Sequence, residues 1–226
     1  MADPDTILRH VEEAVEKQFG GSLHLVLRDK IKDGKLRVDQ GIIAGCAGGM
    51  FDNITEASAI LGSEGTGDGE FSLSVYPSSV PVNLELIRSG AVENLMEAGA
   101  LLKPSFCGPC FGAGDVPANN GLSIRHTTRN FSSREGSRPG DGQLAGVILM
   151  DARSIAATAR NHGVLSSALD LDYEIPADYQ QGYDPSSYKK RVYQGFGHPK
   201  PEVILQFGPN IAPWPKIPPL ADHILV

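Results

Sequence analysis

The stretch GIIAGCAGGMFDNITEASAIL, residues 41–61, decides the fold of this chain. Its first part, 41–45, is a compact apolar run leading into glycine and cysteine, a pattern typical of a buried strand in a parallel sheet. Residues 51–61 then have the pattern of a helix. A strand followed directly by a helix is the repeating unit of α/β proteins, so this stretch predicts that class and places Cys46 at the carboxyl end of a strand.

The same alternation of strand and helix continues along the chain. After a glycine-rich loop, the sequence predicts strands over 71–77, 122–126 and 145–150 and helices over 81–88, 91–99 and 152–162. Pro81 suits the first position of its helix, and Asp151 and Gly163 mark the start and the end of the last one. We therefore predict a three-layer α/β/α domain with a mostly parallel sheet.

The N-terminal residues are predicted to add a helix and a hairpin. Asp5 can cap a helix that runs to Phe19 and ends at Gly20 and Gly21. Short strand candidates over 23–27 and 35–38 lie on either side of an Asp-Gly pair, which favours a β-hairpin between them.

The length and the prolines predict a second, smaller part. At about 150 residues per domain, 226 residues correspond to about one and a half domains. Nine of the 16 prolines follow residue 175, where they exclude regular helix and central strand because proline lacks an amide hydrogen and fixes φ. We predict an α/β domain over 1–170 and a Pro-rich linker over 171–226 that leads to a domain outside this sequence.

Composition excludes several functional classes. With 41% hydrophobic and 21% charged residues the chain can bury a core, which excludes a disordered protein. A net charge of −7 argues against a nucleic-acid-binding surface, and no apolar run approaches the roughly 18 residues of a membrane span. Three cysteines are too few for a disulfide scaffold, and no secretory signal is recognisable. We expect a cytoplasmic protein whose cysteines are ligands or nucleophiles.

The three cysteines are predicted to lie together. Cys107 and Cys110 form a C-x-x-C pair in the loop PSFCGPCFGAGD, and Cys46 is expected at the same edge of the sheet. Three thiolates on a 4Fe–4S cluster leave one iron without a protein ligand, free to act as a Lewis acid on a substrate oxygen. Adjacent glycines let the backbone approach such a bulky group.

Other roles for the cysteines remain open at this point. The C-x-x-C pair also suits a redox dithiol, although such motifs start a helix and this one lies among glycine and proline. A zinc site of the three cysteines with His126 or His162 is a second alternative. Cys46 alone also suits a small buried apolar position.

A second cluster of polar residues follows the strand predicted over 122–126. The segment HTTRNFSSREGSRPGDG, residues 126–142, contains Arg129, Arg134 and Arg138 among threonines and serines. Guanidinium groups bind carboxylates bidentately, so the segment suits a substrate with several carboxylates. The alternative is a solvated loop whose arginines offset the negative net charge.

Three motifs together resemble the iron–sulfur domain, the third domain, of the aconitase superfamily, with its aconitase-like hydratase branch as the nearest match. They are GCAGGMFDN (45–53), FCGPCFG (106–112) and TTRNFSSREGS (127–137). The family has Gly-Ser-Cys-Thr-Asn, Cys-Gly-Pro-Cys and Asn-Arg-Asn-Phe-x-x-Arg at these places. The helix DARSIAATARNHG (151–163) is also similar, and the resemblance covers about residues 40–165.

The resemblance implies a site. Cys46, Cys107 and Cys110 would bind a 4Fe–4S cluster. Arg129 and Arg134 match arginines that contact the substrate, a small hydroxy-di- or tricarboxylic acid, and Thr128 beside them is the third expected substrate-binding residue. Two positions depart from the family pattern. Thr128 stands where the family usually has asparagine, and Ala47-Gly48 replace Thr-Asn, which puts citrate or isocitrate specificity in doubt but not cluster binding.

The resemblance also implies what this sequence lacks. The family's other domains supply histidine, acidic groups, a serine base and a further arginine, so we expect a fragment of a hydro-lyase that is inactive alone and contains no catalytic residue of its own. Its cluster would be exposed to oxygen, and in its absence Cys107 and Cys110 could form a disulfide. An RNA-binding regulatory module, using the basic stretch 28–37, and a degenerate cluster-free structural domain are the alternatives.

Overall fold

The structure is a computed structural model that describes residues 3–67, 69–128, 131–204 and 206–212. The chain divides into two compact units, Met1–Ser187 and Tyr188–Val226, and each is described by itself. The predicted α/β domain lies in the first unit. Within the described ranges, no helix has the length and apolar content needed to cross a membrane.

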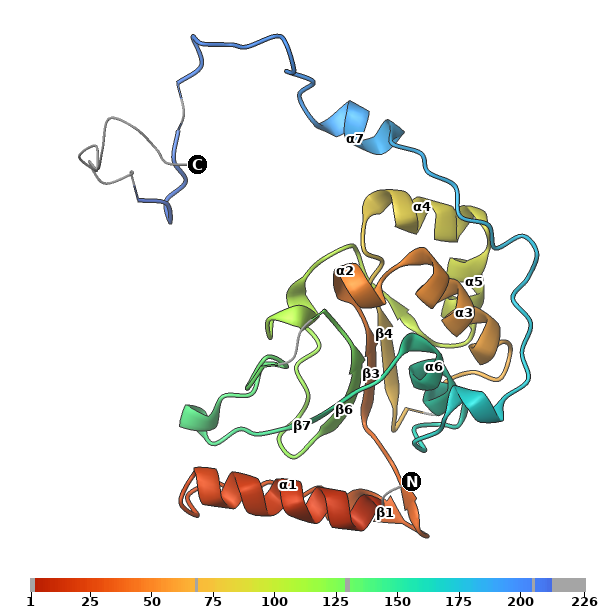
Figure 1. Cartoon of the computed structure of the whole chain (residues 1–226), viewed down its shortest axis with the longest axis vertical. Helices are drawn as coiled ribbons and strands as arrows, with labels where there is room; N and C mark the ends of the chain where they lie inside the picture. Colours follow the sequence, from red (N-terminus) through yellow and green to blue (C-terminus); the bar gives the residue numbers. More distant parts are fainter. Residues whose placement is uncertain (1–2, 68, 129–130, 205, 213–226) are drawn as a thin grey trace, which may run out of the picture. The chain divides into compact units, whose positions relative to one another are not determined.

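A five-stranded sheet, parallel throughout, forms the centre of the first unit (Figure 1). Its strands, in spatial order, are β5 (Leu101–Leu102), β4 (Ser72–Val75), β3 (Gln40–Ile43), β6 (Leu122–His126) and β7 (Gly146–Leu149). The middle strand β3 is the one predicted from residues 41–45, and its Ile43 is level with Val75 of β4 and His126 of β6. The predicted α/β class with a parallel sheet is therefore confirmed, and only the two-residue β5 had no sequence signal.

Helices cover one face of the sheet and form the main core with it. They are α3 (Phe51–Leu61), α4 (Val80–Arg88), α5 (Ala91–Glu97) and α6 (Ala152–Arg160), close to the predicted ranges. Ser79 caps α4, and Asp151 caps α6 by accepting hydrogen bonds from the amides of Arg153 and Ser154 at 3.0 and 3.1 Å. Ile43, Leu73 and Ile124 point from the strands into this core, and each is fully buried.

The opposite face of the same strands is polar and carries the loop with the C-x-x-C motif. Gln40, Ser123 and Arg125 alternate with the apolar residues. Gln40 and Arg125 donate hydrogen bonds to the carbonyl of Asp115 in the segment 103–121, and the Ser123 hydroxyl donates to the Gln40 side chain. This segment contains the short 3-10 helix η2 (Gly108–Cys110). Two short helical turns, α2 (Gly45–Gly48) and η3 (Pro139–Asp141), follow β3 and precede β7.

The N-terminal helix and hairpin form, but two details of the prediction are wrong. Helix α1 (Pro4–Gln18) is capped by Asp3 and not by Asp5, because Pro4 occupies the first helical position and Asp5 lies inside the first turn. Asp33 and Gly34, with φ of +53° and +72°, join β1 (Ile31–Lys32) to β2 (Lys35–Leu36), so the hairpin pairs other residues than predicted.

The predicted strand over 23–27 does not form. The amide of Leu27 donates to the Glu12 carboxylate at 2.7 Å, and the amide of Val26 donates to the Asn120 side chain at 3.0 Å, so side chains occupy the donors that a strand would need. Leu25 and Leu27 are nevertheless buried in the core. The short helix η1 (Arg28–Lys30) follows directly.

Residues 171–187 also belong to the first unit. After η4 (Ala168–Asp170), Tyr173 and Tyr179 pack against the core, and the Tyr179 hydroxyl accepts a hydrogen bond from Asn94 at 2.7 Å. The helix α7 (Ser186–Arg191) follows Pro185, and the boundary between the two units falls inside it. That 171–226 is a linker to a further domain stays a prediction.

Candidate functional site

The strand order defines where this sheet can bind a ligand. From β3 the chain first adds β4 and β5 on one side and then β6 and β7 on the other, so the order reverses between β3 and β6. In such doubly wound sheets ligands bind outside the carboxyl ends of the strands at this switch point. Cys46 follows β3 and Thr128 follows β6, which places two of the predicted site residues there.

Three segments meet tightly at the switch point. Gly45 has φ of +79°, and a Cβ atom added to it would lie 2.6 Å from the sulfur of Cys110 and 2.9 Å from the hydroxyl oxygen of Thr128. Any side chain here would collide with both, so glycine is required for shape as well as for its backbone conformation. The Cys46 sulfur lies 3.2 Å from the same hydroxyl oxygen. Cys46, Cys110 and Thr128 are therefore brought together; that Cys107 lies beside Cys46 as well stays a prediction.

The C-x-x-C pair forms one compact turn. The Cys110 amide donates to the Cys107 carbonyl at 2.8 Å, and the Ala113 amide donates to the Gly108 carbonyl at 2.9 Å. Cys110 is buried, whereas Cys107 and Cys46 are exposed, and all three thiols are free. The disulfide that Cys107 and Cys110 could form is not present in this structure. The turn lies in a loop and starts no α-helix, unlike the arrangement of a redox dithiol.

The zinc alternative finds no support among the described residues. In 3–67, 69–128, 131–204 and 206–212, no three His, Cys, Asp or Glu side chains converge closely enough to hold a single metal ion. His162 lies beside Gly67 and lines a pocket with Lys32 and Arg37 at the hairpin. His126 ends β6, and its buried Nδ1 atom has no hydrogen-bond partner in the described part of the chain. Burial lowers the pKa of His126, and Asp151 partly opposes this effect.

The arginine loop is described in part. Arg129 and Asn130 lie outside the described residues, so the prediction for Arg129 stays untested. The guanidinium carbon of Arg134 lies 4.7 Å from the centre of the Phe131 ring. The buried Nε–H of Arg134 donates to no partner among the described residues.

Sequence reasoning missed Arg125, which the structure places beside the cysteine turn. This residue of β6 is only 2% exposed, and it donates hydrogen bonds to the carbonyls of Pro109 at 3.1 Å and Asp115 at 2.8 Å. Burial lowers its pKa, while Glu135, Asp115 and Cys110 raise it. The available signal was a charged residue inside the strand predicted over 122–126, because arginine is rarely fully buried unless it is paired.

Comparison with known proteins decides the family of this fold and site. A family model described as "Aconitase family (aconitate hydratase)" matches residues 3–157, more than half of the chain. The chain belongs to the aconitase family. The family resemblance stated from the three motifs is thereby confirmed, and the matched range includes the sheet, the three cysteines and the arginine loop.

Similar curated members of the aconitase family share one name. "3-isopropylmalate dehydratase large subunit" of Helicobacter hepaticus is 28% identical over 151 residues, which are 66% of this chain and 34% of that protein. The proteins of that name from Methanoregula boonei and Pyrococcus horikoshii are each 34% identical, over 54% and 48% of this chain and 28% of their own length. The chain spans about a third of the length of these relatives or less.

The residues present fit the iron–sulfur group that the aconitase family implies. The donors are three thiols from two loops, and soft thiolate ligands are the ones that iron–sulfur clusters take. Gly45 also fits such a site. Because it has no Cβ atom, Cys110 and Thr128 can both lie close to its backbone. A cluster is wider than a single ion, so its ligands need not converge as closely as zinc ligands.

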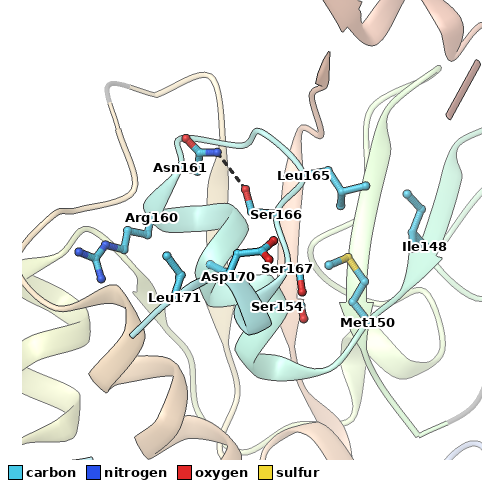
Figure 2. A pocket seen from close by; sticks show the side chains of 11 residues that line it. Ile148, Met150, Ser154, Arg160, Asn161, Leu165, Ser166, Ser167, Asp170 and Leu171 are labelled. Carbon is cyan, nitrogen blue, oxygen red and sulfur yellow. Dashed lines mark hydrogen bonds between the residues drawn. The ribbon is translucent and has the colours of Figure 1, made fainter. Parts of the chain in front are cut away.

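A separate cavity of about 750 Å³ lies between β7, α6 and η4 (Figure 2). Apolar residues such as Ile148, Met150 and Leu165 line one part of it. Its polar part includes Asn161, whose side-chain amide donates to the Ser166 hydroxyl at 2.9 Å. None of the predicted site residues lines this cavity, and the sequence did not predict it.

Proposed function

We propose that this chain is the cluster-bearing part of an aconitase-type hydro-lyase, an enzyme that adds water to, or removes it from, a hydroxy-carboxylic acid. The observation that carries the proposal is the convergence of Cys46, Cys110 and Thr128 at the switch point of the sheet. Membership of the aconitase family supports it, as do relatives that are named dehydratases.

In this proposal Cys46, Cys107 and Cys110 hold a 4Fe–4S cluster. When bound, the cluster supplies an iron without a protein ligand, which acts as a Lewis acid on a substrate oxygen. The Thr128 hydroxyl, at 3.2 Å from the Cys46 sulfur, can donate to that thiolate and help to keep it in place. Cytoplasmic location belongs to the same proposal, since thiols stay reduced there.

Arg134 and Arg129 are the proposed substrate ligands. A guanidinium group recognises a carboxylate through two parallel hydrogen bonds, and it orients the substrate before the reaction. The Phe131 ring lies against the Arg134 guanidinium group, whose carbon is 4.7 Å from the ring centre, and the terminal nitrogens are the proposed donors to a substrate carboxylate because the Nε atom is buried. The residue that moves the proton is proposed to lie outside this sequence, as are the remaining substrate contacts.

Exposed apolar side chains support a partner over this end of the sheet. Met50, Phe106, Phe111 and Phe131, from the loops around the cysteines, are each about half exposed. Large apolar side chains gathered at a site mark a surface that another domain or molecule covers. We propose the remaining aconitase-type domains as that partner, and the relatives' names, "large subunit", are compatible with a further subunit.

Anaerobic reconstitution with iron and sulfide tests the proposed function. Wild type should take up about four iron atoms per chain and develop the absorbance and EPR signals of a cubane cluster. Cys46→Ser should lose the cubane signals. Ser105→Ala is the matched control, because it removes one buried hydroxyl without a partner from the cysteine loop and no thiol. Equal, low iron uptake by all three proteins would contradict the proposal.

A further inference from the structure

The polar face of the sheet holds a buried arginine that no family motif accounts for. Arg125 is 2% exposed, and its Nε atom donates to the Ser123 hydroxyl at 2.9 Å. One terminal nitrogen donates to the Pro109 carbonyl, and the other donates to the Gln40 side chain at 3.1 Å and to the Asp115 carbonyl. Burying a charge is costly unless it is hydrogen-bonded, so this network has to be well ordered.

The partners of Arg125 belong to two different parts of the fold. Ser123 and Gln40 are residues of β6 and β3, the two strands at the switch point. Pro109 and Asp115 belong to the loop that carries the cysteines, and Pro109 stands between Cys107 and Cys110. The guanidinium therefore connects the cysteine turn to the two strands from which the other site residues, Cys46 and Thr128, extend.

Further contacts fix the same loop to the same face. The Gln40 side-chain amide also donates to the Asp115 carbonyl, at 3.1 Å, and the Tyr76 hydroxyl donates to the Asp115 carboxylate. Arg125 thus binds the loop at two carbonyls, those of Pro109 and Asp115, and Cys110 lies between them in the chain. The turn is therefore held in two ways. Its own backbone hydrogen bonds form it, and hydrogen bonds from side chains of the sheet attach the loop around it.

Charge gives Arg125 a second effect on the site. Its guanidinium donates to the carbonyl of Pro109, the residue directly before Cys110, which is the buried thiol of the three. Glu135 and Asp115 are the acidic groups whose charges act on Arg125. Charges interact strongly where water is excluded. A fixed positive charge at this place attracts electron density on the sulfur of Cys110 and on any group that the sulfur binds.

We propose that Arg125 is a positioning residue of the cluster site: it fixes the Cys107–Cys110 turn to β3 and β6 and adds a fixed positive charge beside Cys110. The part that concerns the cluster rests on the proposed function. The part that concerns the turn does not, because it refers only to the protein's own contacts. The two parts are therefore tested separately.

Hydrogen exchange of the cluster-free protein tests the positioning. In Arg125→Met, the amides of Cys110, Phe111 and Ala113, which are bonded within the turn, should exchange roughly tenfold faster, since hydrogen bonds from a charged donor hold the turn in place. Peptides from α3 and α5 should exchange as in wild type. Arg125→Lys keeps the charge but not the fork of donors, so it should give an intermediate increase.

Two control variants separate positioning from general destabilisation. Arg160→Met also removes an arginine that donates to a backbone carbonyl, that of Ile60 at 3.2 Å, but on the helical face. Leu86→Ala opens the buried core next to α4. Neither should speed exchange in the turn. The proposal is overturned if folded Arg125→Met exchanges there like wild type, or if Leu86→Ala, at an equal loss of Tm, has the same effect in the turn.

The reduction potential of the reconstituted cluster tests the charge. Removing a nearby positive charge disfavours the more negative, reduced state, so Arg125→Met should have a lower potential than wild type, and Arg125→Lys should remain close to wild type. Equal potentials in all three proteins would overturn the electrostatic part. If wild type itself forms no cluster, the proposed function fails, and the exchange experiment still decides the positioning of the turn.

Discussion

The two faces of one sheet have different compositions and different tasks. Ile124 and Arg125 are neighbours in β6, yet Ile124 points into the helix-covered core and Arg125 into the polar network beneath the cysteine turn. Side chains alternate along a strand, so each strand serves both faces. The apolar face supplies stability through burial, and the polar face supplies directional hydrogen bonds that set the position of a loop. Substitutions on the apolar face should therefore mainly lower the free energy of unfolding, and those on the polar face should mainly change the order of the cysteine turn.

The largest effect on stability is expected on the apolar face. Ile124→Ala removes a fully buried side chain from the centre of the core and should lower the free energy of unfolding by about 2–5 kcal/mol. Leu149→Ala, on the neighbouring β7 and 49% exposed, should change it by less than about 0.5 kcal/mol. Urea unfolding of the three proteins measures both changes. Similar losses in the two variants would show that the core does not lie on this face.

Gly45→Ala should disrupt the place where the cysteine segments meet. Its φ of +79° and its contacts with Cys110 and Thr128 both oppose a side chain. Gly34, with φ of +72° and no atom within 4 Å of an added Cβ, offers the matched control. Gly34→Ala should cost about 1–2 kcal/mol for the backbone conformation alone. Denaturant unfolding should give a clearly greater loss for Gly45→Ala, whereas equal losses would mean that the space at Gly45 is open.

The cap of α6 should respond to pH. Burial alone would raise the pKa of Asp151, but hydrogen bonds from Ser154 and Arg153 outweigh it and hold the pKa below its ordinary value of 3.8. A carboxyl with a lowered pKa stabilises the folded state above its unfolded pKa, and this stability is lost as the pH falls through the folded pKa.

Asp151→Ala should therefore lower the free energy of unfolding by about 0.5–2 kcal/mol at neutral pH. Asp151→Asn keeps a capping side chain without the charge, and it should lose less. Thermal unfolding between pH 7 and acid measures the effect, and the difference between wild type and Asp151→Ala should shrink below about pH 4. A difference that stays constant with pH would exclude the charged cap as its cause.

The smallest effect is expected on the polar face. Tyr76→Phe removes the hydroxyl that donates to Asp115 and should cost about 0.5–1.5 kcal/mol, the usual value of one hydrogen bond. Burial and the neighbouring Asp115 raise the pKa of Tyr76, so this hydroxyl stays protonated and remains a donor at neutral pH. Hydrogen exchange in the cysteine turn should rise less than in Arg125→Met. A larger rise would move the main attachment of the loop from Arg125 to Tyr76.

The apolar face could be predicted from the sequence, because burial leaves a periodic pattern. Residues 51–61 form the predicted helix, and the strand before it is the centre of the sheet. Helix caps and hydrogen bonds between side chains and the backbone were harder to predict. The cap of α1 depended on which of two aspartates precedes Pro4, and residues 23–27 looked like a strand although Glu12 and Asn120 bind their amides.

The site could be predicted only through its motifs. That Cys46 and Cys110 lie close together followed from the place of Cys46 after a parallel strand, from the C-x-x-C loop and from the family resemblance, whereas the contact of Thr128 with Cys46 did not. Arg125 has no motif, and its partners lie 10 to 85 residues away along the chain, except for Ser123. Contacts between residues so distant in sequence leave no local pattern, and only the fold reveals them.

The central claim is that the three thiols of this chain hold a cluster with one iron free of protein ligands. Mössbauer spectroscopy of the anaerobically reconstituted chain tests it most directly, before and after addition of a hydroxy-dicarboxylic acid and, separately, of a hydroxy-tricarboxylic acid. The account predicts a cubane cluster in which one iron of the four becomes distinct when the acid is added. A cluster whose iron sites stay equivalent, or iron bound without a cubane signal, would contradict it.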